Sequence, residues 1–321
     1  MIIYLKDTKI NTLSYLDSVV IIGNFDGIHF GHKLLIEIAK KESRYYNRLI
    51  ILYTFYPNTS KIFYEYKKLY LIQNYYKKYN ILFKIGIDLV IIEYFHKQFF
   101  KTSSISFINN ILIKQLNAKS VVIGKGFRFG KIGSGDSFLI KYLLKKNKYI
   151  LYLQKHLLIN NIRCSSTQIR KFIEVGLLIS VFNFMGRHFY LSSLICIGAK
   201  LGRIMHIPTI NISTPNHIYP SPGVYLTYIK ILKYKKKYIA ITNIGYRPTI
   251  KKQYSQYLTI ETHIIHNDTY ITNIYNNKII LFFIKKIREE KKFNNIKDLK
   301  YAIKNDIVFI KKYLFKKFIY K

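Results

Sequence analysis

The chain has 321 residues and a formal net charge of +37, and 50% of its residues are hydrophobic. This length allows one large or two ordinary domains, and the apolar fraction is too high for a wholly disordered chain. Its 2 cysteines, Cys164 and Cys196, form neither a C-x-x-C motif nor a framework of pairs, which argues against a disulfide-stapled domain and against a cysteine-based zinc site.

Strands and helices alternate in the first half of the predicted structure. Because strands separated by helices form βαβ units, this order predicts a parallel sheet. The sequence pattern changes near Gly186. After this residue, short β-prone runs are separated by Pro, Asn and Gly, as in an antiparallel barrel or sandwich. We place a domain boundary there, between residues 1–184 and 185–321. The predicted strands cover 19–22, 49–55, 88–92, 120–123, 149–153, 191–197, 224–232, 238–242, 258–265 and 278–284, and the predicted helices cover 33–48, 103–116, 136–146, 165–175 and the tail from about 296.

Neither a signal peptide nor a membrane-spanning helix is predicted. The N-terminus lacks the basic region, apolar stretch and small-residue cleavage site of a signal peptide. The longest uncharged run, residues 204–229, contains four prolines (Pro208, Pro215, Pro220 and Pro222), which are incompatible with a lipid-spanning helix. We therefore expect a cytoplasmic protein with no membrane partner.

The excess of cations allows two interpretations. A basic stripe would indicate nucleic-acid or anionic-membrane binding, but the lysines here are scattered over almost every segment. Residues with A- and T-rich codons (Lys, Ile, Asn, Tyr, Phe) are abundant, whereas Ala, Gly, Pro and Arg are scarce. We attribute the charge to this bias and expect no specific nucleic-acid partner.

The loop from Gly23 to His32 follows the first strand and opens a helix. Loose backbone amides and the positive end of the helix dipole make this position of an α/β sheet a phosphate site. His29 and His32 are three residues apart, so both imidazoles can face one bound anion from the first turn.

Three other segments point to the same edge of the predicted sheet. The run 163–170 places hydroxyls at another helix start with an arginine one turn along, which suits a triphosphate. The loop 124–136 is too rich in glycine for a plain turn, and the segment 53–57 ends the second strand where such folds bind ligands.

These segments, in this order, resemble the N-terminal half of the bacterial bifunctional riboflavin kinase/FAD synthetase family, a Rossmann-like adenylyltransferase domain of the H-x-G-H nucleotidyltransferase superfamily. The resemblance implies that FMN attacks ATP to give FAD and pyrophosphate, with His29 and His32 stabilising charge on the phosphates. It departs from the family at Asn58, where the family has His, and at Gly126, where the family has Asp or Asn. The ATP and phosphate residues it implies are Gly23, Phe25, Asp26, Gly31, Arg163, Ser165, Ser166, Thr167 and Arg170, and the flavin residues are Phe55, Pro57, Asn58, Gly126, Phe127, Arg128 and Phe129.

The second half carries a glycine-bearing loop, 198–203, followed by Pro208-Thr209-Ile210-Asn211. Such a loop can wrap phosphates, and the oxygens of Thr209 and Asn211 suit Mg²⁺, a hard cation. Glu261 stands mid-strand in a chain with only 16 acidic residues, and a positioned carboxylate fits the phosphorylation of an alcohol.

With the segments 220–225, 243–249, 261–263 and 288–293, this half resembles the riboflavin kinase module of the same family, a small antiparallel β-barrel with a C-terminal helix. By resemblance, Glu261 is the base for the riboflavin 5′-hydroxyl, and Thr209 and Asn211 bind Mg²⁺ with ATP. Ser193 and His206 stand where the family usually has glycine. The ATP residues implied are Gly198, Gly202, Arg203, Pro208, Thr209 and Asn211, and the flavin residues are Arg247, Arg288 and Glu290.

The leading hypothesis is therefore a two-domain enzyme that makes FMN and then FAD from riboflavin, with ATP and Mg²⁺ in both steps. One alternative is that one of the two activities has been lost, with the altered ATP loop around His206 suspected before the His29/His32 pair. Another is that the chain is a superfamily relative that adenylates or cytidylates a different phosphate. From a different class, the charge allows a nucleic-acid-binding protein on a vestigial nucleotidyltransferase fold.

Overall fold

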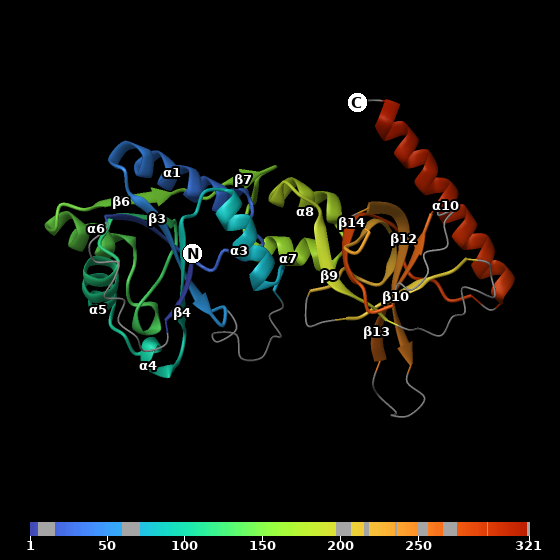
Figure 1. The fold of residues 1–321 in the computed structure, drawn as a ribbon, viewed down its shortest axis with the longest axis horizontal. Coiled ribbons are helices and arrows are strands. Elements are labelled where there is room, and N and C mark those ends of the chain that lie inside the picture. Colours follow the sequence, from blue (N-terminus) through green and yellow to red (C-terminus); the bar gives the residue numbers. More distant parts are fainter. Residues whose placement is uncertain are drawn as a thin grey trace. The chain divides into compact units, whose positions relative to one another are not determined.

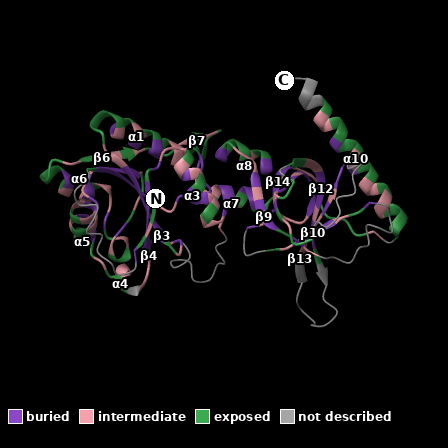
Figure 2. Ribbon diagram, in the orientation of Figure 1, coloured by how far each residue is buried: buried purple, intermediate pink, exposed green. Residues whose placement is uncertain are grey.

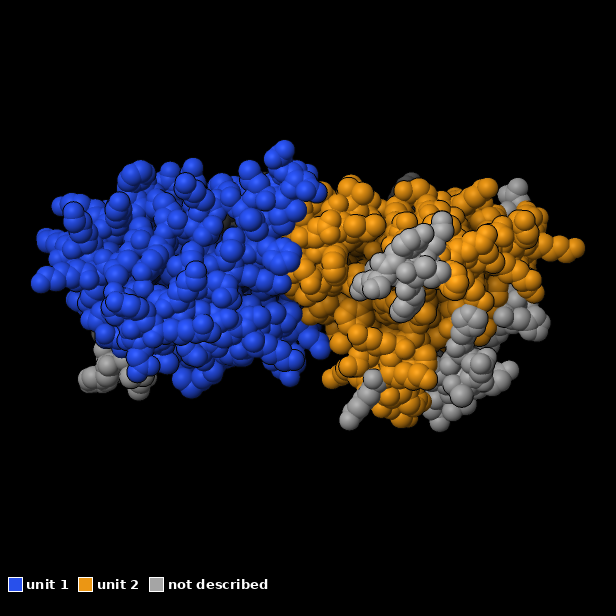
Figure 3. Space-filling model, turned by 90° about the horizontal axis from the view of Figure 1, so that it is seen from above, with its two compact units in different colours: residues 1–166 blue, residues 167–321 orange. Residues whose placement is uncertain are grey.

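The structure is a computed structural model that describes residues 1–5, 17–59, 71–196, 207–214, 218–234, 236–248, 256–265, 275–293 and 295–319. The chain divides into two compact units, unit 1 from Met1 to Ser166 and unit 2 from Thr167 to Lys321, coloured blue and orange in Figure 3. The division falls before the predicted boundary at residue 184, because the segment between them packs within unit 2: Gly176, for example, lies against Tyr225 and Lys286. The boundary at 184/185 stays a prediction.

Unit 1 is built on a six-stranded sheet with the strand order β1-β4-β3-β2-β5-β6 (Figure 1). Every neighbouring pair in it is parallel, as predicted. The first strand, β1, lies at the edge and was not predicted, because alternate residues of this short strand are exposed rather than forming a buried run. The strands are β1 (Ile2–Leu5), β2 (Ser18–Ile22), β3 (Leu49–Tyr56), β4 (Leu89–Tyr94), β5 (Ala118–Gly124) and β6 (Ile150–Gln154).

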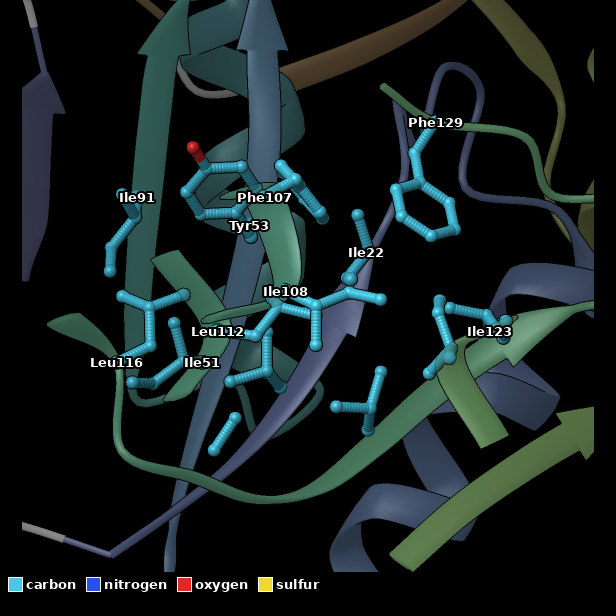
Figure 4. Packing of buried hydrophobic residues seen from close by; sticks show 14 of the residues in the cluster. Ile22, Ile51, Tyr53, Ile91, Phe107, Ile108, Leu112, Leu116, Ile123 and Phe129 are labelled. Carbon is cyan, nitrogen blue, oxygen red and sulfur yellow. The ribbon is translucent and has the colours of Figure 1, made fainter. Parts of the chain in front are cut away.

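Helices cover both faces of this sheet, because successive side chains of β2 point to opposite sides. Val19 and Ile21 pack in a cluster with α1 and α3, whereas Val20 and Ile22 belong to a second cluster with η1 and α6. Figure 4 shows this second cluster, in which the rings of Tyr53 and Phe107 meet edge to face. The elements are α1 (Phe30–Tyr46), α3 (Tyr75–Lys84), α4 (Lys97–Phe100), α5 (Ser104–Ser106), the π-helix η1 (Phe107–Gln115), the 3-10 turn η2 (Lys131–Gly133), α6 (Ser137–Lys146) and the hairpin β7 (Leu158–Ile159) with β8 (Ile162–Arg163).

Unit 2 is a closed barrel with the strand order β10-β13-β12-β11-β14-β9, and all of its pairings are antiparallel. The predicted barrel is therefore confirmed. The short strand β10 was not predicted, because Pro208 precedes it and it contributes only 3 residues. The strands are β9 (Phe189–Cys196), β10 (Ile210–Ile212), β11 (Gly223–Ile231), β12 (Lys236–Pro248), β13 (Gln256–Ile264) and β14 (Lys278–Arg288), and the helices are α7 (Ser166–Glu174), α8 (Leu178–Met185) and α10 (Ile296–Ile319).

Helix α10 covers part of the outer wall of the barrel. Val224 and Leu226 of β11 and Ile241 of β12 form a hydrophobic cluster with Ile310, which is fully buried on α10. In Figure 2 the strands of both sheets are largely buried, whereas the outer side of α10 is exposed. No helix in the described part of the chain is long and apolar enough to cross a bilayer.

A buried polar network ties α1 to the sheet at the end opposite the predicted site. The carboxylate of Glu42 is 5% exposed and accepts hydrogen bonds from Arg48 Nη1 (2.9 Å), Tyr152 Oη (2.5 Å) and Ser120 Oγ. Burial, with Glu42 as hydrogen-bond acceptor and negative neighbour, raises the pKa of Tyr152 to about 12. Removing the cation of such a pair leaves a buried charge uncompensated, which is costly.

We predict that Arg48→Met destabilises unit 1 by about 3 kcal/mol, because the buried Glu42 carboxylate loses its counter-ion. Hydrogen exchange of the β5 amides checks this, since core strands exchange through global opening. Arg44→Met changes an exposed arginine of α1, is the matched control, and should change stability by less than about 0.5 kcal/mol. Equal exchange rates in the two variants would contradict the role of the network.

Candidate functional site

The turn between β2 and α1 places two histidines at the carboxyl edge of the parallel sheet. Phe25, Gly27 and Ile28 adopt left-handed backbone with φ of 51°, 80° and 34°. This tight turn leaves His29 extended as the N-cap of α1, where its Nδ1 accepts the backbone N–H of His32 at 3.3 Å. A helix N-terminus with partial positive charge therefore lies next to both imidazoles.

Three aromatic rings stack at the start of α1. The imidazoles of His29 and His32 lie 3.6 Å apart between ring centroids, and Phe25 stacks on His32 at 4.4 Å. Gly31 makes this arrangement possible, because a Cβ there would lie 3.1 Å from the His29 ring and 3.4 Å from the carbonyl of Cys164. The structure thus brings together the two histidines that the sequence singles out.

The segment that ends unit 1 reaches this turn. Ser166 Oγ donates to the backbone carbonyl of Asp26 at 2.8 Å, so one of the predicted phosphate-binding hydroxyls is already used to hold the turn. Asp26 is buried, and both oxygens of its carboxylate accept the backbone N–H of Ile72, at 3.1 and 3.2 Å. Of the other predicted residues, Gly23 and Ser165 are half-buried and Arg163 is exposed in unit 1, while Thr167 is exposed and Arg170 half-buried on α7 in unit 2.

The residues predicted to bind flavin in unit 1 end the neighbouring strands. Phe55 and Asn58 are buried at the end of β3, and Pro57 between them is half-buried. Beyond β5, Phe127 stacks on buried Phe129 with ring centroids 5.8 Å apart. Gly126 takes a φ of 86°, a left-handed conformation that glycine adopts freely and that Asn and Asp, the family's residues there, tolerate best among the others. Exposed Arg128 lies 3.7 Å from the Asp136 carboxylate.

Unit 2 contains a cavity of about 270 Å³ on the outer side of the barrel, under α10 and the segment that precedes it. Glu261 and Thr209 line it. Glu261 stands opposite Asn211 on one neighbouring strand and opposite Asn243 on the other, so the three side chains share one face of the sheet. His263 Nδ1 lies 2.9 Å from the carbonyl oxygen of Pro208 and so links β13 to the segment that carries Thr209.

An ion pair joins α10 to the wall of the cavity. Arg288 forms a bidentate pair with Asp306, with Nε 3.0 and 3.1 Å and Nη2 2.9 Å from the carboxylate oxygens. Glu290 packs against Gly245, where a Cβ would overlap its carboxylate. Several lining residues were not among the predicted site residues, because their contribution depends on the packing of α10 and on strand register. Four of them lie in segments that carry the family resemblance, namely Asn243, Tyr246, His263 and Phe293, and three lie on α10, namely Leu299, Ile303 and Asp306.

Some predictions fall outside the described residues. Gly198, Gly202, Arg203 and His206 belong to that group, and the side chain of Arg247 is also not described. Ser193, a departure from the family pattern, is buried, and its hydroxyl donates to the Ser213 carbonyl at 2.6 Å. No cluster of three or more His, Cys, Asp or Glu side chains suited to a metal ion occurs among the residues that the structure describes.

Comparison with known proteins assigns each part of the chain to a family. A model of the FAD synthetase family matches residues 13–168, and a model of the riboflavin kinase family matches residues 185–314. A protein from Buchnera aphidicola subsp. Schizaphis graminum, named bifunctional riboflavin kinase/FMN adenylyltransferase, is 35% identical over 95% of each chain. This chain belongs to that bifunctional family.

Another protein with the same name, from Escherichia coli K12, is 28% identical over 90% of each chain. Among solved structures, one from Streptococcus pneumoniae entitled macrolide-efflux protein superposes with a TM-score of 0.82 and covers 95% of this chain and 97% of its own. At 24% identity, this likeness concerns the fold alone.

We predict that Asp306→Ala loosens α10 on the cavity, because Arg288 loses a charge-assisted bidentate partner, at a cost of about 1–3 kcal/mol. Hydrogen exchange of α10 amides should be faster in this variant. Asn305→Ala changes the adjacent exposed residue of α10 and should leave exchange as in the unmodified chain. If Asp306→Ala also left it unchanged, the ion pair would not hold the helix.

Proposed function

We propose that this chain converts riboflavin to FMN in unit 2 and FMN to FAD in unit 1, using ATP in each step. The observation that carries the proposal is that one chain holds two separate constellations. One is a stacked histidine pair at a helix N-terminus, and the other is a cavity lined by a carboxylate and a hydroxyl, with amides beside the carboxylate on one strand face. Both fit the membership of the bifunctional family.

In the FAD-forming step, a phosphate oxygen of FMN attacks the α-phosphorus of ATP, the bond to the bridging β-phosphate oxygen breaks, and pyrophosphate leaves. Negative charge develops on the phosphate oxygens, and preorganised donors stabilise it without a covalent nucleophile. We assign this role to His29 and His32, with the α1 N-terminus beside them. Gly23, Phe25, Asp26, Gly31, Arg163, Ser165, Ser166, Thr167 and Arg170 would bind and shape the ATP site, and Phe55, Pro57, Asn58, Gly126, Phe127, Arg128 and Phe129 the flavin site.

In the FMN-forming step, the riboflavin 5′-hydroxyl attacks the γ-phosphorus of ATP and ADP leaves. Glu261 would accept the hydroxyl proton, since a carboxylate within hydrogen-bond reach is a competent base for an alcohol. Its place on the cavity wall, half-buried and flanked by amides of the neighbouring strands, supports this role. ATP would be bound by Gly198, Gly202, Arg203, Pro208, Thr209 and Asn211, and the flavin by Arg247, Arg288 and Glu290.

The oxygen donors at this cavity suit Mg²⁺. Thr209 lines the cavity and Asn211 stands opposite Glu261, so a hydroxyl and an amide carbonyl lie near the carboxylate. Mg²⁺ prefers such hard oxygens and completes its shell with water and nucleotide phosphates, so a large protein cluster is not needed. We propose that Thr209 and Asn211 hold it; when bound, it neutralises charge on the phosphates.

The proposal also includes the partners of the protein, its location and its domain boundary. The partners would be small molecules, namely riboflavin, FMN and ATP, rather than a specific nucleic acid, because the cations are dispersed over the sequence. The location would be the cytoplasm. The boundary between the two functional domains would lie in the sequence between residues 184 and 185.

We predict that the full chain with riboflavin, ATP and Mg²⁺ produces FMN and then FAD, separated by chromatography. Excess EDTA should stop both products because the phosphates lose their counter-ion. Absence of both flavins in the Mg²⁺ sample would overturn the proposal, and FMN without FAD would restrict the chain to its kinase step. A salt titration against RNA should show no tight binding at physiological ionic strength.

Separate substitutions should divide the two steps. His32→Ala should lower FAD formation from FMN by about 10²-fold or more and leave FMN formation unchanged, because it removes one phosphate-stabilising donor. Glu261→Gln should do the reverse, with FMN supplied directly to test FAD formation. Loss of both steps in either variant, or of neither, would refute that assignment.

A further inference from the structure

Lys78 of α3 is a buried cation that the two steps above do not use. Its side chain is 3% exposed, although it is a lysine in a chain whose lysines are mostly on the surface. Its Nζ donates to the backbone carbonyl of Asn24 at 3.0 Å, in the turn that leads from β2 to His29. Lysine is almost never fully buried unless it has a partner, so this position needs an explanation.

The surroundings of Lys78 are arranged around the turn. The cleft beside it is lined by Asn24 and Asp26 from the turn and by Asn58 and Phe55 from the end of β3. The ammonium group is directed at the backbone of the turn itself, where Nζ donates to the Asn24 carbonyl. Its role is therefore to act on the groups that surround it.

Residues outside the turn form hydrogen bonds with Asn24 and Asp26 and so fix its position. Ser166 Oγ holds the Asp26 carbonyl, the Ile72 N–H holds the Asp26 carboxylate, and Asn24 Nδ2 donates to Thr59 Oγ1 at 2.8 Å. Lys78 is a charged donor to this turn, and its charge interacts favourably with that of Asp26. This backbone turn positions the Phe25 ring against His32 and leaves His29 at the N-cap of α1.

We propose that Lys78 is a positioning residue for FAD formation: its ammonium holds the Asn24–His29 turn beside Asp26 and thereby keeps the stacked His29 and His32 imidazoles aligned for the phosphates. This inference rests on the proposed function of unit 1. Displacement of reacting groups by about 1 Å costs about 10²-fold in rate, so a small shift of the turn is enough to be measured.

Titration of Lys78 offers a readout that a simple packing role would not give. Burial lowers the pKa of Lys78 to about 8, partly opposed by the charge of Asp26. Among the described residues, the other titratable groups that face it are Tyr75 and Tyr79 of its own helix, whose ring centroids lie 5.3 and 4.9 Å from Nζ. Burial raises the pKa of Tyr75 to about 12 and raises the pKa of Tyr79 further, so neither loses its proton near pH 8.

The sign of the stability effect separates positioning from unfolding. The folded pKa of Lys78 lies below its ordinary value of 10.5, so the unfolded chain binds this proton more strongly between pH 8 and 10.5. The contribution of Lys78 to the free energy of unfolding therefore rises with pH over this window. A fall in activity over the same window cannot come from unfolding driven by this group.

The test compares the full chain with Lys78→Met, Lys78→Arg and, as control, Lys84→Met at an exposed position of the same helix. FAD formation from FMN and FMN formation from riboflavin are measured on each sample. At pH 7, Lys78→Met should lower kcat for FAD formation by about 10- to 100-fold. FMN formation and the Lys84→Met variant should be unaffected.

The pH profile completes the test. The unmodified chain should lose FAD-forming activity, relative to FMN formation, with an apparent pKa of about 8. Lys78→Arg should retain activity above this pH because a guanidinium stays protonated, and Lys78→Met should show no such fall. An unchanged rate in Lys78→Met, or loss of both activities in it, would overturn the inference while leaving the proposed function intact. A chain that makes FMN but no FAD would overturn both.

Discussion

The turn from β2 into α1 is the constraint on which the histidine site depends. Three of the four residues from 25 to 28 have positive φ and reverse the chain within a few positions, so that His29 caps a helix whose first turn also carries His32. Left-handed backbone is unfavourable for Phe25 and Ile28, so contacts from outside the turn must hold it. Those contacts come from Ile72, Lys78 and Ser166, which lie far away in the sequence.

The sheet explains why those distant segments can reach the turn. All its strands are parallel, so the loops that follow β2, β3 and β5 leave from one edge. β2 lies between β3 and β5, and the chain leaves β2 toward β3 first and later returns to form β5 on its other side. Ligands of open α/β sheets bind where the strand order reverses in this way. The histidine pair stands directly after β2, at that point.

Unit 2 builds its cavity differently. The cavity lies on the outer wall of the barrel, between α10 and the strands β12 and β13. Here the walls are fixed by strand register, which sets Asn211, Glu261 and Asn243 side by side, and by the Arg288–Asp306 pair, which ties α10 down. Each half of the chain thus holds its polar groups on regular elements rather than on loops alone.

Much of this architecture could be read from local pattern. Buried β-branched runs such as 19–22 and 120–123 identified the central strands, and the alternation of strands with helices identified the parallel sheet. Edge strand β1 and the short strand β10 were not predicted, because neither has a long apolar run and both exist through pairing with distant strands. Helix α3 also went unpredicted, and with it the buried lysine.

The sequence by itself determined the fold class, the two-part organisation and the candidate residues, because glycines, histidines and acidic residues stand out against a background of Lys, Ile, Asn and Tyr. Only the tertiary structure decided which of them meet. Lys78 is one of 53 cations in the sequence, and Asp306 is one acidic residue on a basic helix. Their importance arises from burial and from partners distant in the chain, because the energy of a charge depends on what surrounds it rather than on its neighbours in sequence.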